Sequence, residues 1–176
     1  MIYIETPRLL LRDWRECDTP LFQAMNSNPL TMEFFLNTLS IEESNLFLKR
    51  IKKEFLERSY GLYAVELKES GKFIGYTGFH YTEMQSHFAP CVEIGWRYLP
   101  EAWGHGYATE ATKACLTYAK ENLPFKEVYS FTSLLNKRSE KVMKRVGMTQ
   151  LENFAHPAVP YGHRLKEHVL YKITLE

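Results

Sequence analysis

A strand, a glycine-containing turn and a long helix follow one another in the middle of the chain, and this unit constrains the fold most. Apolar and polar side chains alternate over Cys91–Tyr98, which predicts a strand, and Pro100 ends it. The segment Gly104–Asn122 opens with two glycines and continues as a helix with an apolar face of small residues and leucine. Such a face needs a sheet to pack on, so the unit predicts helices packed against a sheet.

The remaining segments extend this pattern along the whole chain. Apolar runs predict further strands, and apolar residues at helical spacing predict further helices. The predicted strands are Ile2–Arg12, Gly61–Leu67, Phe73–Phe79, Val128–Thr132 and a final pair, the last of which carries Val169, Tyr171, Ile173 and Leu175 on one side. The order of elements predicts a mixed sheet sandwiched by helices, an α/β or α+β fold, in a single domain spanning residues 1–176.

Local signals indicate where several helices begin or end. Asp18 and Thr19 are predicted to cap a short first helix that ends near Asn28-Pro29. Ser40 followed by Glu43 is a capping box, which opens a second helix. Gly147 comes directly after the predicted helix Asn136–Val146, in the position where glycine commonly ends a helix.

Charge and cysteine content exclude several classes of protein. The 176 residues carry 22 Lys and Arg against 21 Asp and Glu, a formal charge of +1. Such a chain lacks the basic face that gripping a phosphate backbone requires, so direct nucleic-acid binding is not expected. Cys17, Cys91 and Cys115 are too scattered for a disulfide framework or a zinc ribbon. No signal peptide and no run of 18 apolar residues is found, so a cytoplasmic protein without a membrane partner is expected.

The turn Pro100–Ala108 offers chemistry as well as geometry. A helix N-terminus presents unpaired N–H groups and a partial positive charge, and glycine lets an anion approach the backbone closely. The turn is therefore a candidate cradle for a pyrophosphate. It is not a Walker motif, because no Gly-Lys-Ser/Thr sequence follows, and Thr109 replaces the third glycine of a dinucleotide fingerprint. The alternative is a tight turn that needs glycine only for its backbone dihedrals.

Three separated segments carry motifs that occur together, in this order, in one family. They are Glu5–Arg12 (ETPRLLLR), Ile94–Ala111 with IGW and WGHGYATEA, and Asn136–Met148 with NKRS, Val142 and VGM. The central segment resembles the acetyl-CoA motif of the GNAT superfamily of N-acyltransferases, and the last resembles the N-x-x-S helix of that family. The first resembles the branch that contains the ribosomal-protein N-terminal acetyltransferases of the RimJ/RimL type.

This resemblance implies a fold and an acyl donor. The fold is the single-domain acyl-CoA N-acyltransferase fold, with a mixed, mostly antiparallel, twisted sheet that is flanked by helices and split between the fourth and fifth strands. The donor is acetyl-CoA, with no metal, and its pantetheine arm pairs with the open strand edge while the glycine turn holds the pyrophosphate. The residues implied to bind it are Ile94, Trp96, Tyr98, Trp103, Gly104, His105, Gly106, Tyr107, Ala108 and Asn136.

One position departs from the pattern of the family. Glu101 stands where the glycine loop of the family usually has Gln or Arg, and a carboxylate that faced a pyrophosphate would repel it. Glu101 is therefore expected to point to solvent or to be offset by nearby basic residues. The backbone N–H groups from Trp103 to Ala108 are expected to do most of the binding.

Transfer of an acetyl group to an amine requires a neutral amine, a polarised thioester carbonyl and a route for the leaving thiolate. Glu93 is the candidate base, directly or through water, because its apolar neighbours would raise its pKa; a salt-bridged or solvated strand residue is the alternative. By resemblance, Ser139 donates a proton to the departing sulfur, or it is an ordinary polar residue of a first helical turn. Asn136 binds the pantetheine amides or caps its own helix, and the two roles are compatible.

The expected reaction is direct attack of a primary amine in a ternary complex, and the expected acceptor is a protein or peptide N-terminus, such as that of a ribosomal protein. At pH 7, neutralising an α-amine costs about 1.4 kcal/mol, against about 4.6 kcal/mol for lysine. A small amine (polyamine, amino acid or antibiotic) is one alternative, and a non-catalytic acyl-CoA-binding module is another.

The acceptor pocket is expected to be lined by the first two helices and by the segments around Phe34-Phe35, His80-Tyr81 and His156–His163. The protein is expected to be a monomer or a homodimer. The histidine spacing indicates no metal site.

Overall fold

The computed structural model describes residues 1–176 and contains one eight-stranded sheet with the strand order β1-β2-β3-β4-β5-β6-β8-β7. Every neighbouring pair is antiparallel except β5 and β6, which run parallel. The strands are β1 (Ile2–Glu5), β2 (Leu9–Arg12), β3 (Leu62–Leu67), β4 (Phe73–Thr82), β5 (Cys91–Tyr98), β6 (Glu127–Ser133), β7 (Thr149–Ala155) and β8 (Glu167–Thr174). The helices are α1 (Thr19–Ser27), α2 (Ile41–Arg58), α3 (Tyr107–Asn122) and α4 (Lys137–Arg145), with short 3-10 turns at Glu16–Asp18 and Pro100–Ala102.

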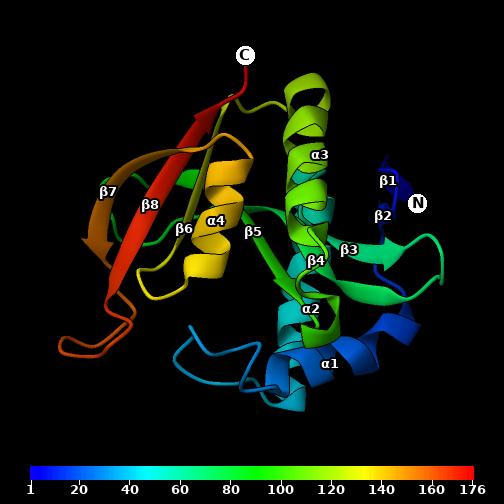
Figure 1. Cartoon of the computed structure of the whole chain (residues 1–176), viewed down its shortest axis with the longest axis horizontal. Coiled ribbons are helices and arrows are strands. Elements are labelled where there is room, and N and C mark those ends of the chain that lie inside the picture. The colour runs from blue at the N-terminus through cyan, green and yellow to red at the C-terminus, as the bar shows by residue number, and fades with distance from the viewer.

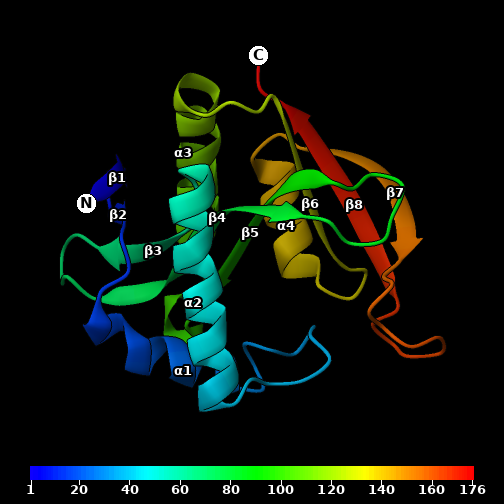
Figure 2. The same cartoon turned by 180° about the vertical axis from the view of Figure 1, so that it is seen from behind.

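Helices cover both faces of the sheet, as the order of elements predicted. Figure 1 shows α3 and α4 on the near face, and Figure 2, from behind, shows α2 and α1 on the other. Two apolar clusters correspond to these layers: the larger contains Ala111 and Cys115 of α3, and the smaller contains Phe22 of α1 and Ile51 of α2. None of the helices combines the length and apolar character that a membrane crossing needs.

The sheet opens between β5 and β6, the fourth and fifth of the predicted strands. The two strands share a single point of register, at Glu93 and Tyr129. Just beyond it, the Ser130 hydroxyl donates a hydrogen bond of 3.0 Å to the Ile94 carbonyl. The rest of β5, towards Tyr98, has β4 on one side only. This split was expected from the family resemblance, and it is confirmed.

Several local predictions are confirmed. Ser40 and Glu43 form the predicted capping box, with bonds of 3.1 Å from Glu43 N–H to the Ser40 hydroxyl and 2.7 Å from Ser40 N–H to the Glu43 carboxylate. Gly147 follows α4 with φ of 90°, in the left-handed region that glycine adopts without strain. β3 and β4 form the predicted antiparallel hairpin.

Two predictions about element boundaries are wrong, and a third holds without the expected side-chain bond. The segment Ile2–Arg12 is two antiparallel strands, because the chain reverses at Thr6, whose backbone N–H donates to the Leu9 carbonyl. α3 begins at Tyr107 and not at Gly104, because Gly104 and Gly106 have φ of 80° and 78°. Asp18 is the N-cap residue of α1, as predicted, but its buried side chain makes no cap hydrogen bond to α1 and instead accepts from the Arg12 guanidinium and from Arg15 N–H.

Candidate active site

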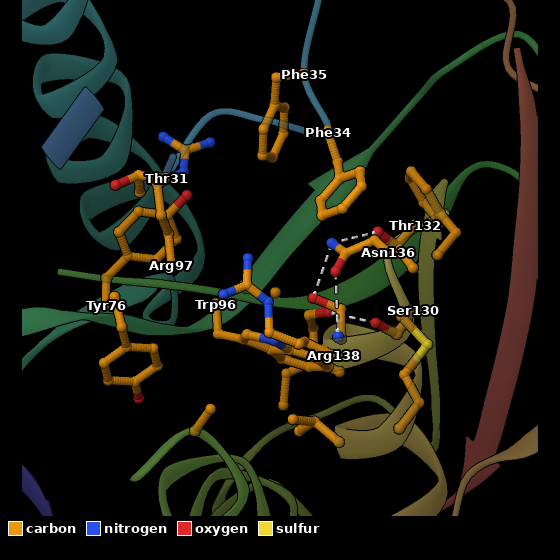
Figure 3. A pocket seen from close by; sticks show the side chains of 18 of the residues that line it. Thr31, Phe34, Phe35, Tyr76, Trp96, Arg97, Ser130, Thr132, Asn136 and Arg138 are labelled. Atoms are coloured by element: carbon orange, nitrogen blue, oxygen red, sulfur yellow. Dashed lines mark hydrogen bonds between the residues drawn. The ribbon is translucent and has the colours of Figure 1, made fainter. Parts of the chain in front are cut away.

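A cavity of about 850 Å³ lies at the opening between β5 and β6. Its walls come from β5, the glycine turn, α3, β6 and α4, and from two loops that precede α2 and β8. Figure 3 shows the two ends of this cavity, with Arg97, Tyr76 and Phe35 towards one end and Asn136, Ser130 and Arg138 towards the other. Most of the residues predicted for the site therefore surround one continuous space.

The glycine turn leaves its backbone donors free. None of the N–H groups from Gly104 to Thr109 donates a hydrogen bond to another group of the chain. No side chain caps α3, whose N-cap is Gly106 itself. A Cβ at Gly104 would meet nothing within 4 Å, so this side of the turn is open for a ligand. Six unpaired donors at a helix N-terminus fit an anion such as a pyrophosphate.

The N-terminal motif holds this turn in place. Glu110, in the first turn of α3, accepts hydrogen bonds from the Thr6 hydroxyl at 2.7 Å and from Arg8 Nε at 2.7 Å. Burial alone would raise the pKa of Glu110, but these bonds outweigh it and hold the pKa below its ordinary value. The Arg8 guanidinium also covers the Tyr107 ring at 4.6 Å. The first strands are thereby fixed to the helix that carries the candidate anion site.

The predicted binding residues of β5 present their backbone to the open edge. The Ile94 carbonyl accepts from Ser130, and the Tyr98 carbonyl accepts from the Trp103 indole N–H at 3.0 Å. Because the backbone direction alternates along a strand, the N–H and C=O of Trp96, midway between them, face the same edge. No strand pairs with β5 there. The edge can therefore accept an extended ligand that carries amides.

Two residues of the turn lie outside the cavity, and for Glu101 this was expected. His105, which was predicted to bind the donor, is exposed, stacks on Tyr107 with ring centroids 5.2 Å apart and does not line the cavity, although its backbone N–H is among the free donors of the turn. Glu101 points away from the cradle, and its carboxylate lies 3.3 Å from Lys72 Nζ. Its own backbone N–H and Lys72 lower its pKa, so it is an anion held outside the cavity.

Asn136 and Ser139 form one hydrogen-bonded unit at the start of α4. The Asn136 amide oxygen accepts from Ser139 N–H at 3.3 Å, and its amide nitrogen donates to the Ser139 hydroxyl at 3.1 Å and to Thr132 at 3.0 Å. Asn136 thus caps its helix, which was one of its two predicted roles. The Ser139 oxygen accepts from Asn136, so the proton of its hydroxyl is free to be donated elsewhere. Both residues line the cavity.

Glu93, on β5, also lines the cavity. It lies opposite His80 across the β4–β5 pair, and His80 Nδ1 is 2.9 Å from the Glu54 carboxylate of α2. Burial raises the pKa of Glu93 to about 7, with the His80 charge opposing this shift and the Glu54 charge reinforcing it. The hydrogen bond with Glu54 raises the pKa of His80. Glu93 can therefore exchange a proton near neutral pH.

The predicted acceptor segments are only partly brought to the cavity. Phe34, Phe35, His80 and His156 line it, as predicted. Tyr81 does not, because it lies under the Arg58 guanidinium at 3.8 Å. His163 does not either, because its ring accepts from Leu165 N–H within its own loop.

Several further lining residues were missed, among them Arg97, Thr31 and His168. For Arg97 a signal was present in the sequence: it lies two and four residues after Gly95 and Glu93, so the alternation of β5 puts all three on the same face. Thr31 lies in a loop without periodicity, so no sequence pattern indicates its position. The His168 ring lies against that of His156 at a tilt of 47°, with centroids 4.8 Å apart, and burial lowers the pKa of both, that of His168 to about 4. No group of three or more His, Cys, Asp or Glu side chains is arranged to hold a metal ion.

The sequence of the chain is similar to those of known proteins. Residues 8–149 match the family described as the acetyltransferase (GNAT) domain. The chain is 30% identical over 152 residues to the uncharacterized protein YkkB of Bacillus subtilis, covering 81% of this chain and 83% of YkkB. It is 27% identical over 176 residues to the uncharacterized N-acetyltransferase YnaD of the same organism, covering 99% and 98%.

The fold also resembles solved structures. RimL, described as a ribosomal L7/L12 alpha-N-protein acetyltransferase in complex with coenzyme A, superposes with a TM-score of 0.81 at 17% identity. The match covers 99% of this chain and 98% of that one. At this identity the likeness concerns the fold, and it extends over the whole chain.

Proposed function

The chain belongs to the GNAT family of acetyltransferases, and from this premise we propose that it transfers the acetyl group of acetyl-CoA to the α-amine of a peptide or protein N-terminus. The observation that carries the proposal is Glu93, a carboxyl with a pKa of about 7 that faces the cavity beside the open edge of β5. The RimL structure, whose protein is described as an alpha-N-protein acetyltransferase, supports the choice of acceptor.

The donor fits the free groups of the cavity. The unpaired N–H groups of Gly104 to Thr109 would hold the pyrophosphate, and the Trp96 backbone on the β5 edge would pair with the pantetheine amides. Arg138, whose guanidinium lies 3.7 Å over the Trp103 ring, would add positive charge at the same end. When bound, acetyl-CoA supplies an activated acyl group and a thiol leaving group.

Two side chains of the protein, Glu93 and Ser139, would then carry out the proton transfers. Glu93, ionised above pH 7, accepts a proton from the incoming ammonium group, directly or through water. An N–H of the β5 edge stabilises the negative charge that develops on the acyl oxygen, an effect typically worth about 3 kcal/mol. The Ser139 hydroxyl, held by Asn136 as an acceptor, gives its proton to the departing sulfur, and the second proton that the attacking nitrogen loses as the amide forms restores this hydroxyl through water.

The strength of this base suits an α-amine. A carboxylate with a pKa of about 7 takes the proton of an amine of pKa about 8 at a cost of about 1.4 kcal/mol, whereas a lysine amine would cost about 4.6 kcal/mol. A free N-terminus therefore needs no further activation in this cavity.

Thiol release from acetyl-CoA tests the proposal on a panel of acceptors. The panel contains short peptides with a free N-terminus, the same peptides with a blocked N-terminus and one lysine, free amino acids, and spermidine. We expect turnover with free N-termini and little with the blocked peptides. Preferred turnover of spermidine would identify a small-amine acetyltransferase, and binding of acetyl-CoA without turnover on any amine would identify a non-catalytic module.

A further inference from the structure

Arg97 is a buried cation without an anionic partner. Only 8% of the residue is exposed, and no carboxylate lies within 4.0 Å of its guanidinium. Its one hydrogen bond runs from Nη1 to the Asn26 side-chain oxygen, at 2.6 Å. Its Nε is buried and has no acceptor. Charged groups buried in this way are costly unless they are paired, so the missing partner requires an explanation.

The aromatic rings around Arg97 account for only part of this cost. The guanidinium carbon lies 4.5 Å from the Phe35 centroid, 5.4 Å from that of Tyr76 and 5.8 Å from that of Phe47. Ring faces attract a cation and hold the guanidinium plane in position. They accept no strong hydrogen bond in the plane of the fork, where a carboxylate binds bidentately. The rings thus orient the Arg97 guanidinium and leave most of its N–H donors available for a ligand.

A second unsatisfied group borders the same cavity. The Thr31 hydroxyl is buried and has no hydrogen-bond partner, and Thr31 lines the cavity together with Phe35 and Arg97. Figure 3 shows these side chains at the end of the cavity away from Asn136. A hydroxyl and a guanidinium without acceptors, in one enclosed space, match a ligand that brings acceptor oxygens.

The spacing along β5 relates this end of the cavity to the chemistry. Glu93, Gly95 and Arg97 alternate onto one face of the strand, and four residues of a strand span about 13 Å. Between the two charged residues, a Cβ at Gly95 would meet only Glu93 Oε1, at 3.9 Å, so this part of the face is open. An amine beside Glu93 could therefore belong to a molecule that reaches Arg97 with another group.

We propose that the acceptor amine carries a carboxylate several bonds away, and that this carboxylate binds Arg97 and the Thr31 hydroxyl. The inference rests on the proposed function, since it assigns a substrate class to the same site. The distance of about 13 Å along β5 between Glu93 and Arg97 favours an acidic side chain in the first residues of a peptide, because the carboxylate of a free α-amino acid lies only two bonds from its amine. A polycation such as spermidine would be repelled by Arg97.

Matched acceptor pairs test this recognition. One pair is an amidated tetrapeptide with Glu at the second position and its Gln twin, and the other is alanine and alaninamide. For the wild type we expect kcat/KM to favour the acid about 10- to 100-fold in the peptide pair, whereas alanine, whose carboxylate lies beside its amine, should gain little over alaninamide. Equal kcat/KM values within the peptide pair would overturn the proposal.

Variants of Arg97 distinguish a role in carboxylate recognition from a purely structural role. Arg97→Gln should reduce the preference to about twofold while turnover of the neutral twin and binding of CoA stay near wild type. Lys49→Gln removes the same charge from an exposed site on α2 outside the cavity and should keep the preference. An equal loss for acid and neutral twin in Arg97→Gln would show a structural residue and overturn the proposal. If Arg97→Gln does not fold, Arg97→Lys, with a charge but no fork, should show an intermediate preference.

A binding measurement keeps this inference distinct from the proposed function. If no amine is acetylated, the proposed function fails, and calorimetric titration of the same pairs into the CoA-loaded protein decides the inference alone. Tighter binding of the acid, lost in Arg97→Gln, would establish the anion site without transfer. Equal binding of both members of the peptide pair would overturn it.

Discussion

His80 and Glu93 lie directly opposite each other on the antiparallel strands β4 and β5. The His80 ring bonds to Glu54 of α2 at 2.9 Å, and this bond raises its pKa. A positive charge on His80 favours the ionised form of Glu93, while burial raises the Glu93 pKa to about 7. The proposed base Glu93 is therefore coupled through His80 to helix α2, one of the two helices that were predicted to line the acceptor pocket.

Glu93→Gln should remove the inflection near pH 7 from the rate of transfer. The carboxyl is neutral below its pKa and becomes a base above it, so the wild-type kcat should rise as the pH increases through about 7. The ratio of wild-type to variant kcat should be about 100 at pH 8 and should fall to about 10 at pH 6 and to a few-fold at pH 5.5, because the ionised fraction of Glu93 falls about tenfold per pH unit below its pKa. Thiol release measured from pH 5.5 to 9 checks this, and a ratio independent of pH would exclude Glu93 as the base.

His80→Gln should move the same inflection to higher pH. Protonated His80 lowers the pKa of Glu93, so its replacement by a neutral side chain leaves the effect of burial less opposed. His87→Gln is the matched control, because His87 is exposed and pairs with Glu152 outside the cavity. The pH profile of kcat is the measurement. A profile of His80→Gln that coincides with the control would show that the two groups are not coupled.

Gly104→Leu should weaken acetyl-CoA binding at least tenfold. A side chain there would enter the open side of the turn, where the free N–H groups are expected to meet the pyrophosphate. The left-handed backbone should also cost about 1–2 kcal/mol of stability. Gly71→Leu carries the same strain, with φ of 67° and nothing within 4 Å, in the β3–β4 hairpin. Calorimetric titration with acetyl-CoA should therefore find wild-type affinity in Gly71→Leu, and equal losses in both variants would refute the cradle.

The sequence predicts those parts of the site that lie on periodic or strongly signalled segments. The alternation of β5 places Glu93 on one face, and the glycines at 104 and 106 mark the turn, because these features depend on local geometry. The neighbours of Arg97 could not be predicted in the same way. Asn26 of α1 and Phe35 of the loop before α2 reach it from positions more than 60 residues away, and no local pattern links either of them to β5. Asp18 has the local signature of a cap, yet its partner Arg12 is selected by the packing of the first strands.

Ser139→Ala should lower kcat about 3- to 10-fold near pH 7 with little change in the KM for acetyl-CoA. The hydroxyl is proposed to protonate a departing thiolate, and a thiol with a pKa near 8.5 leaves without help once the pH is high. The defect should therefore shrink as the pH rises through 9. Steady-state kinetics at pH 7 and pH 9.5 are the measurement, and a defect of equal size at both would show that Ser139 does not act as a proton donor.

Asp18→Asn should lower the free energy of unfolding by about 3 kcal/mol or more. Asp18 is 1% exposed and accepts two hydrogen bonds from the buried Arg12 guanidinium, at 2.7 and 2.9 Å. The neutral amide would leave Arg12 with Glu66 as its single carboxylate partner, and breaking a buried ion pair typically costs about 3–5 kcal/mol. Asp13→Asn is the matched control, because Asp13 forms an exposed ion pair with the N-terminus, which should contribute less than about 1 kcal/mol. Urea denaturation of both variants compares the two sites, and a loss at Asp18 no greater than that at Asp13 would mean that this buried network contributes little to holding α1 against the first strands.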